Sequence, residues 1–202
     1  MAYIEKTAFE ARITNNEFNE LVNVTGRFQT DGADDVCPAG FLCVRREQLP
    51  CAGFAGIKNE NAWYMNAAAA SVTANDVIYA SNTYDVNLIQ DPVTGNSYAI
   101  GKDTLGLPIP KGRDGTFTQI VFDNVHVYRF GEGNANAAVG SNKFFTIADG
   151  LLVPAAAAPT AVGAVYFELR GTGNFTVGTR SGFGYIDVVA RKVSAGAATP
   201  GV

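Results

Sequence analysis

The chain has 202 residues, of which 47% are hydrophobic and 17% charged, a composition too apolar for a disordered protein. A chain of this length can fold as one domain and bury roughly 70% of its unfolded surface. The formal net charge is -4, from 15 Lys and Arg residues against 19 Asp and Glu residues. This balance argues against nucleic acid as a partner and against electrostatic binding to a membrane.

The amino-terminal residues carry charge within six positions and contain no apolar run of the about 7 to 15 residues that a secretory signal needs. We therefore expect synthesis in a cytoplasm. The longest uncharged stretch, residues 150–167, approaches the length of a membrane-spanning helix, but Pro154 and Pro159 interrupt it. We expect this stretch to be a flexible connection that runs into a strand.

Residues 1–30 contain large apolar side chains that follow neither a helical nor a strand period. Such a segment buries its apolar side chains against its own domain or against another molecule. The sequence predicts an extended docking arm over residues 1–30, with Phe9, Ile13 and Phe18 as anchors. The alternative is a first strand or helix of the chain's own core.

The three cysteines, Cys37, Cys43 and Cys51, have spacings that match no paired-cysteine zinc site. In a reducing compartment Cys43, between Leu42 and Val44, should behave as a small buried apolar residue. The acidic run at 31–35 lacks the alternating ligands of a calcium loop. We expect no metal and no cofactor.

The one predicted helix covers residues 61–71, where four consecutive alanines favour helix. It contains the only tryptophan, Trp63, beside Tyr64. Large aromatic side chains serve either as core anchors or as interface anchors. We take Trp63 and Tyr64 as candidate interface residues.

Short runs of β-forming residues occupy much of the remaining chain. In the middle they cover 77–80, 84–89 and 97–100, and Pro92 and Gly95 predict a hairpin between the last two. In the last ninety residues, further strands are predicted at 116–122, 125–130, 143–148, 162–169, 174–177 and 185–192. A tight turn is expected to join the first two of these.

This spacing, with glycine at the joints, is typical of antiparallel β proteins. We predict a mainly β chain: an antiparallel sandwich or barrel-like domain over 31–193, with long loops, little helix and a flexible tail at 194–202.

Residues suited to catalysis are few. His126 is the only histidine, and Asp123 should project from the opposite face of the same strand. The glycine-rich segments at 95–102 and 171–178 lack the spacing and the following residues of phosphate-binding loops. We expect His126 to be structural, the glycines to form turns, and the chain not to be an enzyme.

Four stretches between Cys37 and Gly115 resemble one family of virion proteins. They read CPAGFLCV, GFAGIKNENAWYMNAAAAS, DVIYASNTYDVNLIQDPVTGNSYAIG and TLGLPIPKGRDGTFT. The resemblance is to the head decoration, or cement, proteins of tailed bacteriophages. It implies a structural virion protein that binds the major capsid protein on the capsid exterior, often as a homotrimer. The resemblance assigns no role to an individual residue.

Three alternatives remain. One is a tail-tube or other virion structural subunit. Another is a carbohydrate-binding β module, whose sign would be Trp63, Tyr64 and Tyr84 on one exposed platform. The last is a virion-associated glycan hydrolase, which needs two carboxylates in a cleft.

Overall fold

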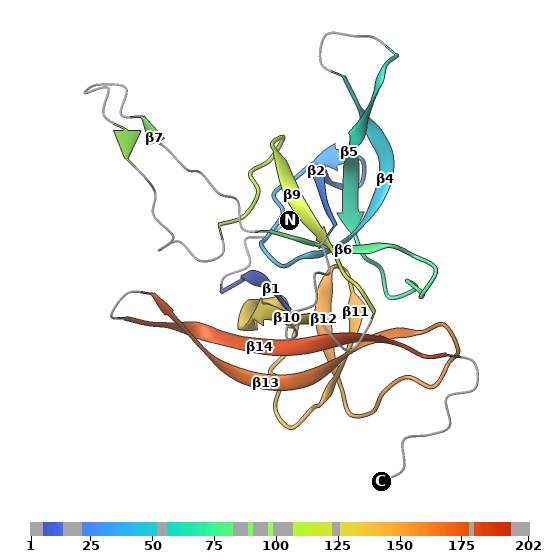
Figure 1. The fold of residues 1–202 in the computed structure, drawn as a ribbon, viewed down its shortest axis with the longest axis vertical. Helices are drawn as coiled ribbons and strands as arrows, with labels where there is room; N and C mark the ends of the chain where they lie inside the picture. Colours follow the sequence, from blue (N-terminus) through green and yellow to red (C-terminus); the bar gives the residue numbers. More distant parts are fainter. Residues whose placement is uncertain are drawn as a thin grey trace.

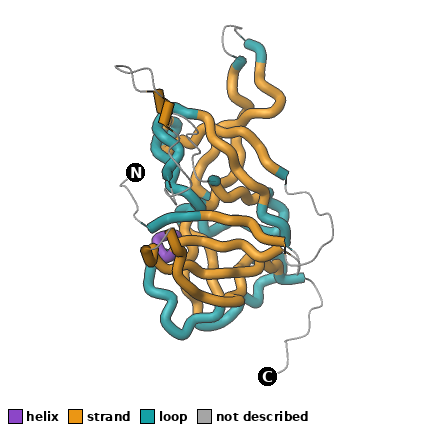
Figure 2. Tube along the Cα trace, turned by 60° about the vertical axis from the view of Figure 1, so that its left-hand side comes forward, coloured by secondary structure: helices purple, strands orange, loops and turns teal. Residues whose placement is uncertain are grey.

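The chain folds almost entirely into β-strands, which confirms the predicted fold class. The structure, a computed structural model, describes residues 6–13, 22–51, 56–82, 89–90, 97–98, 107–122, 126–177 and 180–194. Within these ranges the strands form a closed barrel and an open sheet, which occupy opposite ends of the long axis (Figures 1 and 2). A single turn of 3-10 helix, η1 (Glu132–Asn134), lies beside the open sheet.

The barrel closes in the strand order β2-β5-β4-β6-β9, because β9 pairs back with β2. Its strands are β2 (Asn23–Thr30), β4 (Leu42–Pro50), β5 (Lys58–Ala67), β6 (Ile78–Ser81) and β9 (Asp114–Gln119). Neighbours are antiparallel except β2 and β5, which are parallel. The short β3 (Ala33–Asp34) pairs with the end of β2.

The open sheet has six antiparallel strands in the order β1-β10-β14-β13-β11-β12. They are β1 (Phe9–Ile13), β10 (His126–Gly131), β14 (Arg180–Lys192), β13 (Val165–Val177), β11 (Phe144–Ala148) and β12 (Leu151–Ala155). The hairpin of β13 and β14 reaches beyond the rest of the sheet (Figure 1). A separate small hairpin pairs β7 (Ile89–Gln90) with β8 (Ser97–Tyr98).

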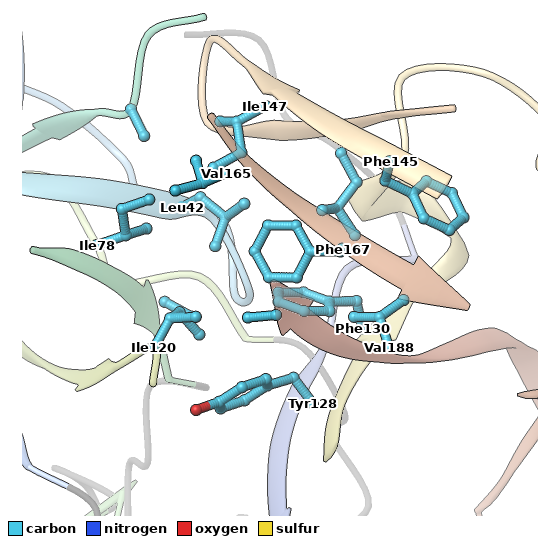
Figure 3. Close-up of a cluster of buried hydrophobic side chains, with 14 of the residues drawn as sticks. Leu42, Ile78, Ile120, Tyr128, Phe130, Phe145, Ile147, Val165, Phe167 and Val188 are labelled. Atoms are coloured by element: carbon cyan, nitrogen blue, oxygen red, sulfur yellow. The ribbon is translucent and has the colours of Figure 1, made fainter. Parts of the chain in front are cut away.

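The main apolar core lies between the wall of the barrel and one face of the open sheet. Figure 3 shows Leu42, Ile78 and Ile120 of the barrel side meeting Phe130 and Phe167 of the sheet. Successive residues of a strand point to opposite faces. Leu42 therefore enters this core while the next residue, Cys43, enters the barrel. All four residues of β6 are buried, because one face of this strand lies against the shared core and the other against the barrel interior.

Hydrogen bonds of the turn at Gly150 and of the Asn134 side chain join the two units of the fold, the barrel and the open sheet. Gly150, between β11 and β12, accepts from Leu42 N at 2.8 Å and donates to Ala68 O at 2.9 Å. The buried Asn134 accepts from Ala8 N at 3.1 Å and donates to Ala39 O at 2.7 Å. The barrel and the sheet are thus tied by polar contacts as well as by the shared core.

Several predicted elements are confirmed. Strands are present in the runs predicted at 77–80, 143–148 and 185–192. Of the hairpin predicted between 84–89 and 97–100, the antiparallel pairing of β7 with β8 is present, and residues 84–88, 91–96 and 99–100 lie outside the described residues.

The predicted helix at 61–71 is wrong, because its first half is the end of strand β5. Backbone pairing with β2 and β4 and the inward burial of Met65 outweigh the helical preference of the alanines. The strands predicted at 116–122 and 125–130 are present as β9 and β10, although they lie in different sheets and do not pair with each other. The turn predicted between them falls on residues 123–125, outside the described residues.

In two places the structure has a β-strand where the sequence analysis predicted a connection between strands. The runs at 162–169 and 174–177 belong to one continuous strand, β13. The stretch 150–167, predicted as a flexible connection that runs into a strand, does run into β13, but it begins with strand β12, so its first part is regular.

The described part of the predicted arm at 1–30 belongs to the two units. Strand β1 is paired with β10 in the open sheet, and β2 is a wall of the barrel. A boundary after residue 30 would cut the hairpin of β2 and β3. Of the predicted tail at 194–202, residues 195–202 lie outside the described residues.

Candidate functional site

The most distinctive surface feature is an open hollow of about 470 Å³ at one end of the barrel. We call it the barrel mouth and define it by its lining residues: Val22, Asn23, Val24, Thr25, Arg45, Asn61, Trp63, Val77, Tyr79 and Gln119. Every strand of the barrel contributes to it. The hollow is therefore formed mainly by the closed sheet, with Val22 and Val77 directly preceding strands β2 and β6.

Strand periodicity explains why these side chains meet. Cys43, Met65 and Phe117 fill the packed interior of the barrel. Two residues along the same strands are Arg45, Trp63 and Gln119, which face the same way because side chains repeat every second residue. The interior thus ends where the large apolar side chains give way to these mouth residues.

Trp63 is the central aromatic group of the mouth. It is half-buried and packs against the interior cluster of the barrel. The guanidinium carbon of Arg45 lies 5.5 Å from the centroid of the Trp63 ring, within the range of a cation–π contact. No ion pair joins Arg45 to any carboxylate in the part of the chain that the structure describes. The Arg45 charge is therefore held in place by an aromatic ring and not neutralised by an acid.

The rest of the mouth combines amides with exposed apolar side chains. Val22 is 51% exposed and Val77 is 37% exposed. Asn23 Oδ1 accepts a 2.7 Å hydrogen bond from Thr118 Oγ1, which orients its amide. The described lining residues include no Asp or Glu. The mouth therefore offers apolar contact area, amide hydrogen bonds and one positive charge, which are the means of binding a partner.

Tyr64, the other aromatic candidate of β5, belongs to the outer wall of the barrel. It stands beside Arg27 in the parallel pairing of β2 with β5. Arg27 Nε donates to Asp114 Oδ1 at 2.8 Å, and this hydrogen bond raises the pKa of the guanidinium. Trp63 and Tyr64 thus do not share one platform, and Tyr84 lies outside the described residues.

The three residues predicted as anchors of the arm, Phe9, Ile13 and Phe18, do not form an exposed cluster among the described residues. Phe9 is 7% exposed and packs in the chain's own core, with its ring centroid 5.2 Å from that of Phe130. As an anchor on another molecule Phe9 is therefore wrong, because it fills the core that the sheet shares with the barrel. Ile13 is paired through its backbone with His126. Phe18 lies outside the described residues.

The remaining reactive residues lie mainly inside the protein. His126 is buried, and its ring centroid is 6.2 Å from that of Tyr128. Cys37 and Cys43 are buried and Cys51 is half-buried. Burial, together with the neighbouring Cys37, raises the pKa of the Cys43 thiol. In the described ranges no three potential metal ligands converge.

A second hollow, about 690 Å³, lies along the β13–β14 hairpin. Its lining includes Lys6, Glu132, Asn136, Asn174 and Tyr185. Lys6 Nζ and Glu132 Oε1 are 2.7 Å apart, so the charges at this groove neutralise each other. The barrel mouth differs in having a charge without an acidic partner among the described residues.

Comparison of the chain with protein-family models, with curated proteins and with solved structures gave no match. Among the described residues there is no helix with the length and apolar character needed to cross a membrane.

Of the mouth residues, the sequence predicted only Trp63 as a candidate. Arg45 and the two valines were missed, because nothing local marks them as neighbours of the tryptophan. The alternation of β4 around Arg45 was the available signal, but it is interrupted by four consecutive polar residues at 45–48.

Proposed function

We propose that this chain is a structural virion protein that binds the outer surface of a tailed-phage capsid through its barrel mouth and reinforces the joints between capsomers. The observation that supports a binding role most strongly is Trp63, half-buried in an open hollow beneath Arg45. Tryptophan and arginine are the residues most enriched among those that dominate binding energy at interfaces. The capsid as the partner rests on the sequence resemblance between residues 37 and 115.

The rim of the mouth supports the same role. Val22 and Val77 expose apolar area beside Trp63, while Asn23, Asn61 and Gln119 supply polar groups around it. An apolar centre with a polar margin is the usual arrangement of a contact surface. On a capsid, such a contact is multiplied by symmetry, so each copy needs only modest affinity. A homotrimer on the major capsid protein follows from the resemblance.

The test uses heads of the encoding phage that lack the protein. Purified protein is mixed with these heads, and bound protein is measured by sedimentation over a range of concentrations. Trp63→Ala should weaken binding about 30-fold, because loss of a central tryptophan at an interface costs about 2 kcal/mol or more. Heads saturated with protein should also burst at a higher temperature than undecorated heads.

The control is Val162→Ser, which removes another exposed apolar side chain at a site outside the mouth. Val162 is 69% exposed. Its substitution should leave binding within about 2-fold of the wild type, since a residue outside an interface contributes little to it. Equal binding by the Trp63→Ala and Val162→Ser proteins, both with native melting temperatures, would overturn the proposed contact site.

A tail-tube subunit is the second candidate, and the long hairpin of β13 and β14 favours it. Strands β13 and β14 have 13 residues each and reach beyond the body of the sheet (Figure 1). Projecting segments of this kind can connect stacked rings. Electron microscopy of the purified protein separates the two candidates: tubes would support the tail-tube function, and particles that attach to heads would support decoration.

A further inference from the structure

We infer that the barrel mouth takes a carboxylate side chain from its partner, so that the partner contributes an acidic peptide segment with apolar residues beside the acid. This inference rests on the proposed function, because it assumes that the mouth is the contact surface. It adds the chemistry of the partner, which the resemblance does not supply.

The charge of Arg45 favours an acidic partner. Four other arginines of the described chain have a carboxylate oxygen within 4 Å: Arg27, Arg129, Arg170 and Arg191. Arg45 has none among the described residues, and neither have the exposed Arg46 and Arg113, but of these three only Arg45 lines the mouth, where no described residue is an acid. In a chain with a net charge of -4, the mouth is thus a local positive site. Such a site favours a negatively charged group on the partner.

The position of the Arg45 guanidinium group suits a carboxylate. Because Arg45 lies over the Trp63 ring at 5.5 Å, its side chain is held before a partner arrives. An ordered guanidinium loses less rotamer entropy on binding. Its planar fork of donors matches the two oxygens of a carboxylate, which makes the paired hydrogen bonds short and directional. The expected contact is therefore bidentate, from Arg45 to a glutamate or aspartate.

The surroundings of Trp63 favour a peptide over an acidic sugar. Arg45 covers a face of Trp63, and the ring also packs against the barrel interior, so the area on which a sugar ring would stack is reduced. The exposed Val22 and Val77 instead offer contact to apolar side chains. The amides of Asn23 and Asn61 can bond to the polar backbone of an extended segment.

The experiment compares three variants of the full chain in binding to undecorated heads. Arg45→Gln removes the charge but keeps an amide of similar reach, and Arg45→Lys keeps the charge without the planar fork. Arg46→Gln is the matched control, since Arg46 is the neighbouring arginine of β4 and does not line the mouth.

Arg45→Gln should weaken binding about 10-fold and reduce its dependence on salt, because an ion pair at an interface is lost. Arg45→Lys should retain intermediate affinity, and Arg46→Gln should bind within about 2-fold of the wild type. Equal effects of Arg45→Gln and Arg46→Gln would overturn the inference. If Trp63→Ala weakens binding while Arg45→Gln does not, the proposed function stands and the carboxylate partner fails. If neither Trp63→Ala nor Arg45→Gln weakens binding, both the proposed function of the mouth and the carboxylate partner are wrong.

Chemical crosslinking identifies the partner group directly. The Arg45→Lys protein, bound to heads, is treated with a water-soluble carbodiimide, which joins an amine to a nearby carboxylate through an amide bond with net loss of water. We expect a crosslink from position 45 to an aspartate or glutamate of the major capsid protein, read by mass spectrometry. A crosslink to a sugar acid, or none at position 45 while other lysines react, would overturn the inference.

Discussion

The barrel mouth and the outer face of the open sheet both hold an arginine beside aromatic rings, yet the two arginines are used differently. In the sheet, Arg129 lies 3.4 Å from the centroid of Tyr185 and pairs with both oxygens of Asp187 at 2.7 Å. In the mouth, Arg45 has the aromatic ring but no acid in the described chain. In the sheet the interaction is completed inside the protein, whereas in the mouth the Arg45 charge stays open to the proposed partner.

This difference has an energetic meaning. The side chains of Arg129 and Asp187 are 11% and 19% exposed, so both are largely removed from water and each depends on the other. Arg45 is exposed, so the folded chain does not need a partner for it. Changes at Arg129 should therefore affect folding, and changes at Arg45 should affect binding.

The joint between the barrel and the sheet should show the largest effect. Gly150 has a φ of 77°, and a Cβ there would overlap the ring of the buried Phe41. Gly150→Ala should lower the free energy of unfolding by about 3 kcal/mol, from backbone strain and overpacking together. Gly163 has a φ of 82° but open space around it, so Gly163→Ala should cost only about 1 kcal/mol. Denaturant unfolding measures both values, and equal losses would contradict this account of the joint.

The two arginines give the next prediction. Arg129→Met should lower the free energy of unfolding by about 2 kcal/mol, because the carboxylate of Asp187 loses its partner in a partly buried site. Arg45→Gln should change it by less than about 0.5 kcal/mol, as is usual for an exposed side chain. Thermal and denaturant melts of the two variants test this directly. A greater loss for Arg45→Gln than for Arg129→Met would contradict the assignment of Arg129 to folding and of Arg45 to binding.

The apolar rim of the mouth should have smaller effects, confined to binding. Val22→Ser and Val77→Ser each remove exposed apolar area without disturbing the core. Each should weaken binding to heads by about 3-fold, since partial burial of a valine contributes less than about 1 kcal/mol. The melting temperature should not change. Binding that matches that of the Val162→Ser protein would remove the valines from the contact surface.

The thiols should differ in reactivity with little effect on stability. Cys51 is half-buried, whereas Cys37 and Cys43 are buried. The raised pKa of Cys43 keeps its thiol neutral and slow to react. An aromatic disulfide reagent should therefore label Cys51 in the native protein and the other two only after unfolding. Labelling of Cys43 at the rate of Cys51 would be inconsistent with the packed barrel interior.

The direction of the Cys43 pKa also predicts a pH dependence. Because the folded pKa is raised, the neutral thiol contributes stability fully below the pKa of the unfolded thiol, about 8.5. That contribution is lost as the pH rises above this value toward the folded pKa. Unfolding free energies measured across this alkaline range should decline less in Cys43→Ala than in the wild type.

The sequence predicted the fold class well where one face of a strand is buried and the other is not. The alternation in 185–192 and 143–148 fixed strands that the structure contains. The sequence did not predict strand β4, because Arg45 and Arg46 interrupt the apolar pattern of a strand whose middle is exposed. It also failed for β5, where the alanines favour helix but pairing with two strands decides the conformation.

The candidate site depended on long-range closure, which local patterns do not encode. Trp63 could be selected as an unusual aromatic residue, but its distance from Arg45 follows from the pairing of β4 with β5. Val22 and Gln119 join them only because β9 pairs with β2 and closes the barrel. The same limit explains Phe9, whose burial depends on the pairing of β1 with β10, more than one hundred residues away.

Electron cryo-microscopy of heads saturated with the protein would show which surface of the chain meets the capsid. The barrel mouth should face the shell, with Trp63 covered and the Arg45 guanidinium against an acidic side chain of the capsid protein. A reconstruction in which the mouth opens to solvent, while another surface of the chain touches the shell, would contradict it.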